Sequence, residues 1–287
     1  MPGKHSTVRA VTYTTLAMLA FAGNSILCRL ALREGTIDPA SFTSIRLAAG
    51  AITLVLILLV LRRGETVRGN GGWISAAMLF AYAIGFSFAY VSLSAGAGAL
   101  ILFGSVQATM IVSGLWSGDR PGPGEWLGWG VALIGLAWLL LPGAQAPPLS
   151  GALLMTAAGA AWGFYSIRGR RESDALGATA SNFLSSLVFV ALLSALTIKS
   201  LDVSSAGVML AIASGALTSG IGYVIWYAAL EYLSAMQAAL VQLSVPAIAS
   251  AGGTLFLAEP LTVRLVAASA LVLGGISLAL SRKPATG

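Results

Sequence analysis

Long apolar runs recur along the whole chain, each about 18–25 residues in length and separated from the next by a short polar interruption. A run of that length, wound as an α-helix, crosses a hydrocarbon core about 30 Å thick. Only 9% of the 287 residues are charged and 57% are hydrophobic, whereas soluble domains carry about 25% charged residues. No segment alternates with the two-residue period of a membrane-spanning strand. The sequence therefore predicts an all-α membrane protein.

Ten runs are expected to form transmembrane helices. They cover residues 10–32, 39–61, 73–93, 97–117, 124–141, 149–167, 175–198, 207–230, 234–257 and 262–281. Loops rich in Lys and Arg stay in the cytoplasm, and an inside N-terminus places far more basic residues on the inner side than on the outer. The inner residues are Lys4, Arg9, Arg62, Arg63, Arg68, Arg120, Arg168, Arg170, Arg171, Arg282 and Lys283, and the outer ones are Arg33, Lys199 and Arg264. We expect a multi-pass protein of a bacterial-type inner membrane with both termini in the cytoplasm.

An internal repeat relates the two halves of the chain. A shift of 140 residues brings the first five expected helices onto the last five without a gap, and it pairs Gly23 with Gly163, Ser94 with Ser234, Ala99 with Ala239, Asp119 with Glu259 and Gly135 with Gly275. Because each half holds an odd number of helices, the second half enters the membrane from the opposite side. Inverted repeats of this kind are typical of transporters whose substrate site lies between the halves near the bilayer midplane. We expect halves at residues 1–145 and 146–287.

Several motifs carry a resemblance to a known family. They are AGNS (22–25), DPASFTSIR (38–46), SLSAGAGALI (92–101), AWGFY (161–165) and SVPAIASAGGTLFLAEPLT (244–262). With these motifs the chain resembles the drug/metabolite transporter superfamily, in its ten-helix form with two EamA-type halves. The first half departs from the pattern, since Val106 stands where the shift places Pro246. Within the superfamily the chain is most similar to bacterial exporters of aromatic amino acids and methionine of the YddG type, which implies a small-molecule substrate and no cofactor.

Polar and aromatic side chains inside the spans are the candidate substrate-binding residues. The amides are Asn24, Gln107 and Gln242, and the deeper aromatic residues are Tyr82, Trp162 and Tyr223. A buried amide must find hydrogen bonds in lipid, and it finds them either with another helix or with a solute in a central cavity. The aromatic residues have the same alternatives, packing between helices or lining a cavity. An aromatic and amide lining without charge suits a solute with apolar bulk and a few hydrogen-bonding groups.

Two further residues and two pairs of residues have structural interpretations. Pro246 removes a backbone hydrogen bond in the middle of the ninth span, which shielded helices tolerate, and it is a candidate hinge. Arg46 lies about 10 Å into the second span, and we interpret it as a structural residue that snorkels toward the interface; the alternative is that it contacts a substrate carboxylate. Gly124 with Gly128, and Ala270 with Gly274, have the spacing of small residues through which helices approach closely.

The chemistry of the chain favours transport over catalysis. Its one histidine is His5, in the N-terminal tail, and Cys28 is its one cysteine, so the spans hold no catalytic pair, metal cluster or disulfide. No basic patch with interleaved aromatic residues suggests nucleic acid, and the basic loops suit lipid headgroups.

The acids lie in loops or at expected helix ends, namely Glu34, Asp38, Glu65, Asp119, Glu125, Glu172, Asp174, Asp202, Glu231 and Glu259. Proton coupling normally uses an intramembrane carboxylate. We therefore expect alternating-access export of small neutral or zwitterionic metabolites, amino acids above all, by facilitated movement or exchange. The alternative is a multidrug exporter of aromatic or cationic compounds in the same fold. The sequence leaves open whether the protein is a monomer or an oligomer.

Overall fold

The computed structural model describes residues 4–61, 71–118, 120–143, 145–170, 172–233 and 235–281. Within these ranges the chain is nearly all helical, and the pairing of Ile37 with Val203 is an isolated antiparallel bridge. The helices are α1 (Lys4–Arg33), α2 (Pro39–Leu61), α3 (Trp73–Tyr90), α4 (Ala95–Trp116), α5 (Pro123–Leu140), α6 (Leu149–Gly169), α7 (Ala175–Thr197), α8 (Ser205–Ala213), α9 (Gly222–Leu230), α10 (Ala235–Gln242), α11 (Ser244–Leu257) and α12 (Val263–Ser281). A 3-10 turn, η1 (Ile198–Ser200), follows α7, and a π-helix, η2 (Ser214–Ile221), joins α8 to α9.

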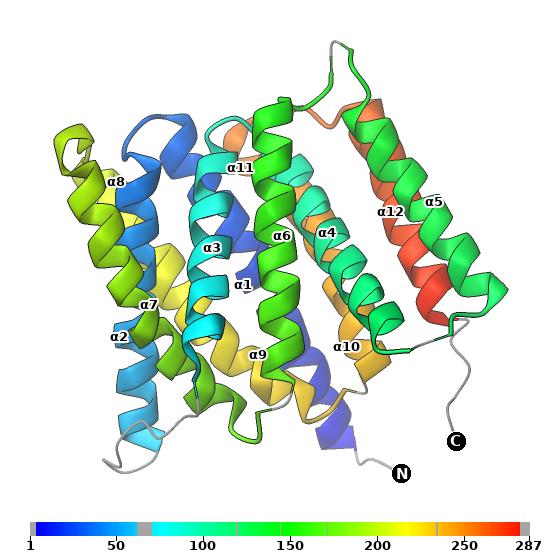
Figure 1. The fold of residues 1–287 in the computed structure, drawn as a ribbon, viewed down its shortest axis with the longest axis horizontal. Coiled ribbons are helices and arrows are strands. Elements are labelled where there is room, and N and C mark those ends of the chain that lie inside the picture. Colours follow the sequence, from blue (N-terminus) through cyan, green and yellow to red (C-terminus); the bar gives the residue numbers. More distant parts are fainter. Residues whose placement is uncertain are drawn as a thin grey trace.

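The predicted class, an all-α membrane protein, is confirmed. In the described part of the chain, nine helical segments are long and apolar enough to cross a membrane, by length and composition. The sixth expected span, α6, is the one missing from these nine; it has 21 residues but is less apolar, because it carries Thr156, Ser166 and Arg168 among many glycines and alanines. It packs against α3 and α4 in the middle of the bundle (Figure 1).

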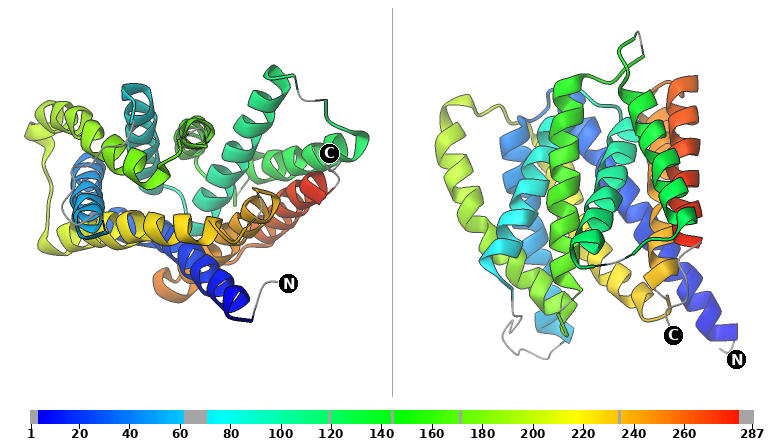
Figure 2. Two further views of the ribbon diagram at one scale, coloured as in Figure 1. Left: turned by 90° about the horizontal axis from the view of Figure 1, so that it is seen from below. Right: turned by 45° about the vertical axis from the view of Figure 1, so that its right-hand side comes forward.

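The membrane-crossing segments alternate in direction, with α8 and α9 in one segment and α10 and α11 in another, and the first helices of the two halves, α1 and α6, run opposite to each other. α1 begins and α12 ends on one side of the bundle, here called the termini side, whereas α6 begins on the opposite side, here called the far side (Figure 1). α5 and α12 lie together at one end of the bundle, and α2, α7 and α8 lie at the other (Figure 2). Several residues used in the orientation, repeat and driving-force arguments lie outside the described residues: Arg62, Arg63, Glu65, Arg68, Asp119, Arg171, Ser234, Arg282 and Lys283.

Small residues bring α5 and α12 into backbone contact. A Cβ atom added to Gly128 would lie 2.5 Å from the Gly275 oxygen, and one added to Gly275 would lie 2.5 Å from the Gly128 oxygen. The prediction for α12 was wrong by one residue, because a Cβ atom on Gly274 meets nothing within 4 Å. Gly and Ala are so frequent in this helix that small-residue spacing alone does not determine which face touches α5.

The predicted ninth span is present and is interrupted near Pro246, where the sequence predicts a missing backbone hydrogen bond. α10 ends at Gln242 and α11 begins at Ser244, with the Leu243 nitrogen bonded to the Leu240 oxygen at 3.1 Å. The cause lies in Pro246, which has no N–H to donate to the Gln242 carbonyl, so the regular α-helical bonding stops there. The break supports a hinge at this point, and the hinge role of Pro246 stays a prediction.

Candidate functional site

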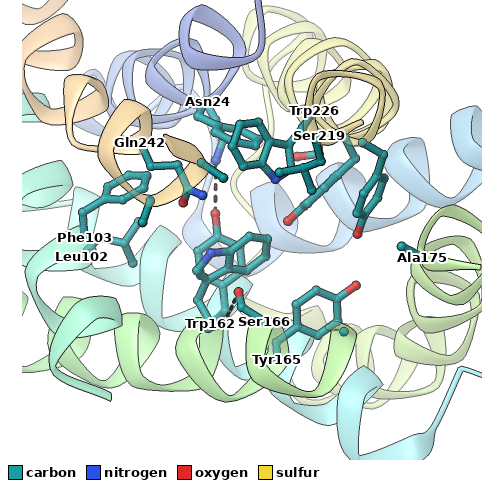
Figure 3. Close-up of a pocket in the computed structure, with 18 of the residues that line it drawn as sticks. Asn24, Leu102, Phe103, Trp162, Tyr165, Ser166, Ala175, Ser219, Trp226 and Gln242 are labelled. Carbon is teal, nitrogen blue, oxygen red and sulfur yellow. Dashed lines mark hydrogen bonds between the residues drawn. The ribbon is translucent and has the colours of Figure 1, made fainter. Parts of the chain in front are cut away.

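A central cavity of about 420 Å³ lies between the two halves. Asn24, Trp162, Trp226 and Gln242 stand around it in Figure 3. Its lining reaches Gly169, Arg170, Glu172 and Leu230, at helix ends or connections on the termini side. The cavity therefore extends from the middle of the bundle toward the termini side.

All six candidate binding residues line this one cavity. They come from six helices: Asn24 from α1, Tyr82 from α3, Gln107 from α4, Trp162 from α6, Tyr223 from α9 and Gln242 from α10. Pro246 does not line the cavity and lies one helical turn beyond Gln242. The structure thus brings the six residues together, and their contact with a substrate stays a prediction.

Aromatic rings form a continuous wall of the cavity, centred on Trp162. Its ring centroid lies 4.7 Å from that of Tyr82, 5.3 Å from that of Tyr165 and 5.6 Å from that of Tyr223. Trp226 continues the wall on α9, 5.8 Å from Phe21. Ring pairs at these distances stabilise one another, so packing between helices and lining of the cavity are combined in the same side chains.

A polar cluster lies beside the aromatic wall. Arg46 donates from Nη2 to the Tyr82 hydroxyl at 2.9 Å, and Asn24 donates from Nδ2 to the same oxygen at 3.3 Å (Figure 3). The Asn24 Oδ1 in turn accepts a hydrogen bond from Ser214 Oγ at 2.7 Å. This chain of bonds joins α1, α2, α3 and η2, and we call Arg46, Tyr82 and Asn24 the arginine cluster.

The interpretation of Arg46 as a snorkelling residue was wrong. Its side chain is 3% exposed and lines the cavity, with the guanidinium carbon 4.9 Å from the centre of the Phe86 ring and 5.2 Å from that of Tyr82. Depth along a helix does not give the direction of a side chain, and here α2 turns Arg46 inward. The sequence contained a signal, since Thr43 precedes Arg46 by about one turn and is buried as well.

A polar network around Glu259 connects helix ends on the far side. Its Oε1 pairs with Arg29 Nε at 3.0 Å, and its Oε2 accepts from the Ala95 nitrogen at 2.8 Å, at the start of α4. Arg29 also donates to the Tyr90 oxygen at 2.9 Å, at the end of α3. Ala258, with φ 51°, adopts the left-handed conformation that ends α11 just before Glu259. We call Arg29 and Glu259 the far-side ion pair, and it ties α1 to the ends of α3, α4 and α11.

The sequence alone did not reveal this ion pair. Glu259 was noted as a repeat position, as part of a motif and as an acid at an expected helix end, whereas Arg29, inside the expected first span, was not considered. The signal lay in that span, because an arginine in an apolar helix needs a partner. Arg29 and Glu259 also line a second cavity, of about 450 Å³, on the far side.

The far side also holds a contact between the α1–α2 and α7–α8 connections. The Asp38 nitrogen donates to the Asp202 oxygen at 2.8 Å, and the Ser204 nitrogen donates to the Thr36 oxygen at 2.9 Å. Burial raises the pKa of Asp38, but hydrogen bonds from Ser41, Asp202 and Ala40 to its carboxylate outweigh burial and hold the pKa below its ordinary value. Asp38 is therefore charged while it caps the start of α2.

Comparison with known proteins gives matches along the whole chain. The sequence profile of the EamA-like transporter family matches residues 8–141 and again residues 149–281. An uncharacterized protein of Pseudomonas aeruginosa is 53% identical over 273 residues, which cover 95% of each chain. An uncharacterized transporter of Archaeoglobus fulgidus is 39% identical over 69 residues, 24% of this chain and 25% of that one. A solved crystal structure shares the fold with a TM-score of 0.66 at 20% identity, covering 95% of this chain and 99% of the other.

Proposed function

Because the chain belongs to the EamA-like transporter family, and so is a membrane transporter and not an enzyme, we propose that it exports small neutral or zwitterionic metabolites, amino acids above all. The observation that carries the proposal is the convergence of six polar and aromatic residues from six helices on one cavity of about 420 Å³. A cavity of that size, aromatic with a few amides, suits a solute with one apolar part and a few polar groups. The likeness to exporters of aromatic amino acids and methionine supports the same substrate class.

We propose alternating access as the mechanism. The cavity extends to the termini side, and the far-side ion pair joins four helices at the opposite end. If the termini side faces the cytoplasm of a cell with an inner membrane, this arrangement loads solute from inside. Release then requires the far side to open, with the halves, residues 1–145 and 146–287, rocking against each other around the break near Pro246.

The driving force follows from the positions of the acids. Glu172 lies at the termini-side mouth of the cavity and Glu259 lies in the far-side network, so among the described residues the middle of the cavity is lined by no carboxylate. A carboxylate there is the usual carrier of a coupled proton. We therefore propose facilitated movement or solute exchange.

Transport into proteoliposomes tests the proposal. Purified protein is reconstituted and given a panel of labelled amino acids, with and without a pH gradient, and protein-free liposomes serve as the control. We expect saturable uptake of large apolar amino acids that changes less than about twofold when the gradient is collapsed, because no cavity carboxylate takes part. Uptake of aromatic cations without any amino acid would support the multidrug alternative and refute the proposal.

A further inference from the structure

We propose that the arginine cluster binds a carboxylate group of the transported solute. The proposal rests on the proposed function in one respect, that the central cavity is the transport path. Its evidence is separate, because it comes from the hydrogen-bonding capacity that these three side chains leave unused.

Arg46 is a buried cation without an acidic partner. Within the described residues the far-side ion pair is the one salt bridge, and it does not include Arg46. A guanidinium has five N–H donors and no acceptor. Only Nη2 bonds a protein atom, the Tyr82 hydroxyl, and both Nε and Nη1 are buried without a hydrogen-bond partner.

Tyr82 and Asn24 add further donors. The Tyr82 oxygen accepts hydrogen bonds from Arg46 and from Asn24, and neither bond uses its own hydrogen, since a guanidinium cannot accept one. Asn24 gives one amide hydrogen to Tyr82 and has a second, while its oxygen accepts from both Ser214 and Thr218. The unused groups of the arginine cluster are therefore all donors.

A carboxylate supplies what this cluster lacks. Burying an unpaired charge is strongly unfavourable, and the Phe86 and Tyr82 rings near the guanidinium offset only part of that cost. A carboxylate has two oxygens that accept several hydrogen bonds, and such bonds are strongest when the groups are charged. It would accept from the Tyr82 hydroxyl and the Asn24 amide, with the Arg46 charge directly behind them.

The rest of the cavity then determines the shape of the solute. The wall of Trp162, Tyr223 and Trp226 takes the apolar part, and the amide oxygens of Gln107 and Gln242 are available to an ammonium group. The substrate class becomes solutes with one free carboxylate, which includes amino acids. Their esters, their amides and simple amines are excluded.

Binding of four matched probes to the purified full-length protein tests the proposal. The probes are phenylalanine, 3-phenylpropionate, phenylalaninamide and phenylethylamine, and the readout is the rise in melting temperature with probe concentration. We expect the two acids to bind about 10–100-fold more tightly than the two probes without a carboxylate, because hydrogen bonds to a charged group contribute more than those between neutral groups. In Arg46→Gln this preference should disappear, with the binding of phenylethylamine unchanged.

Two variants keep the test decisive. Arg168→Gln is the matched control, since Arg168 donates to Ser75 at 3.0 Å and does not line the cavity, and its preference for acids should equal that of the wild type. If Arg46→Gln does not fold, Tyr82→Phe keeps the ring, removes one donor and should lower the preference about 3–10-fold. Failure of the acids to bind, equal binding of all four probes, or an unchanged preference in a folded Arg46 or Tyr82 variant overturns the carboxylate site. The proposed function fails separately, if proteoliposomes carry no amino acid.

Discussion

Replacing Glu259 with Gln should open the far side. The substitution keeps an oxygen that can accept from the Ala95 nitrogen and removes the charge that attracts Arg29. With an effective dielectric constant of about 20, two unit charges 3.0 Å apart attract each other by about 5.5 kcal/mol. The two side chains are 14% and 10% exposed. The amide NH2 group of Gln cannot accept a hydrogen bond from Arg29, which keeps its bonds to the Tyr90 and Val91 oxygens, so we expect a net loss of about 1.5–3 kcal/mol.

The substitution destabilises the conformation in which the far side is closed, because the far-side ion pair joins helices that must separate when that side opens. A change of 1.4 kcal/mol is a factor of ten in an equilibrium constant, so the population open on the far side should rise about 10–100-fold. Cys28 reports on that population. It is the single cysteine of the sequence, it precedes Arg29 directly, and it is fully buried.

The assay is the rate at which a thiol reagent labels Cys28 in purified protein. We expect slow labelling of the wild type and about 10–100-fold faster labelling of Glu259→Gln, since the rate follows the open population. Glu125→Gln is the matched control: Glu125 is also buried, 7% exposed, and accepts from the Gly122 nitrogen at 2.7 Å, at the start of α5 on the termini side. Equal labelling rates in folded Glu259→Gln and Glu125→Gln would refute the closing role of the far-side ion pair.

Five other substitutions test the packing, the electrostatics and the cavity. Gly275→Ala should cost about 1–3 kcal/mol of stability because its Cβ meets the α5 backbone, while Gly274→Ala should be neutral or stabilising; equal melting temperatures would contradict the α5–α12 contact. Asp38, with a lowered pKa, stabilises the fold above the unfolded pKa of about 3.9 and loses this effect as pH falls through the folded pKa. The melting-temperature difference between wild type and Asp38→Asn should therefore shrink between about pH 7 and pH 3, and a constant difference would show that the charge is irrelevant. Trp162→Ala should change which amino acids compete for transport while it lowers stability by less than the roughly 3–5 kcal/mol of a purely packed aromatic, and Gln242→Leu should alter transport in a stable protein; normal transport by either stable variant would remove that residue from the site.

Length and hydropathy predicted most of the fold and most of the cavity wall. A helix in lipid satisfies its own backbone, so apolar runs of sufficient length identify the spans. Lipid also makes polar side chains within the spans easy to identify as candidates. Asn24, Gln107 and Gln242 had to face protein or water, and all three line one cavity.

Features that depend on pairing between distant helices could not be predicted. Arg29 and Glu259 are 230 residues apart, and nothing local to either residue identifies the other. The direction of Arg46 depends on α3 and η2, which cover α2 only after folding. The choice of Gly275 over Gly274 depends on the rotation of α12 against α5, which a small-residue pattern does not specify.

The π-helix η2 has a consequence for how the chain tolerates changes in length. Its wide turns hold more residues than α-helical turns do, because each bond spans five residues in place of four. Deleting one residue between Gly215 and Ile221 would let these turns tighten to α-helical ones, with Tyr223 and Trp226 still facing the cavity. The same deletion in α3, which is α-helical throughout, would rotate every later residue by about 100° and turn Tyr82 away. Natural variation in length should therefore be accepted in the second half of the chain at a place where the first half excludes it.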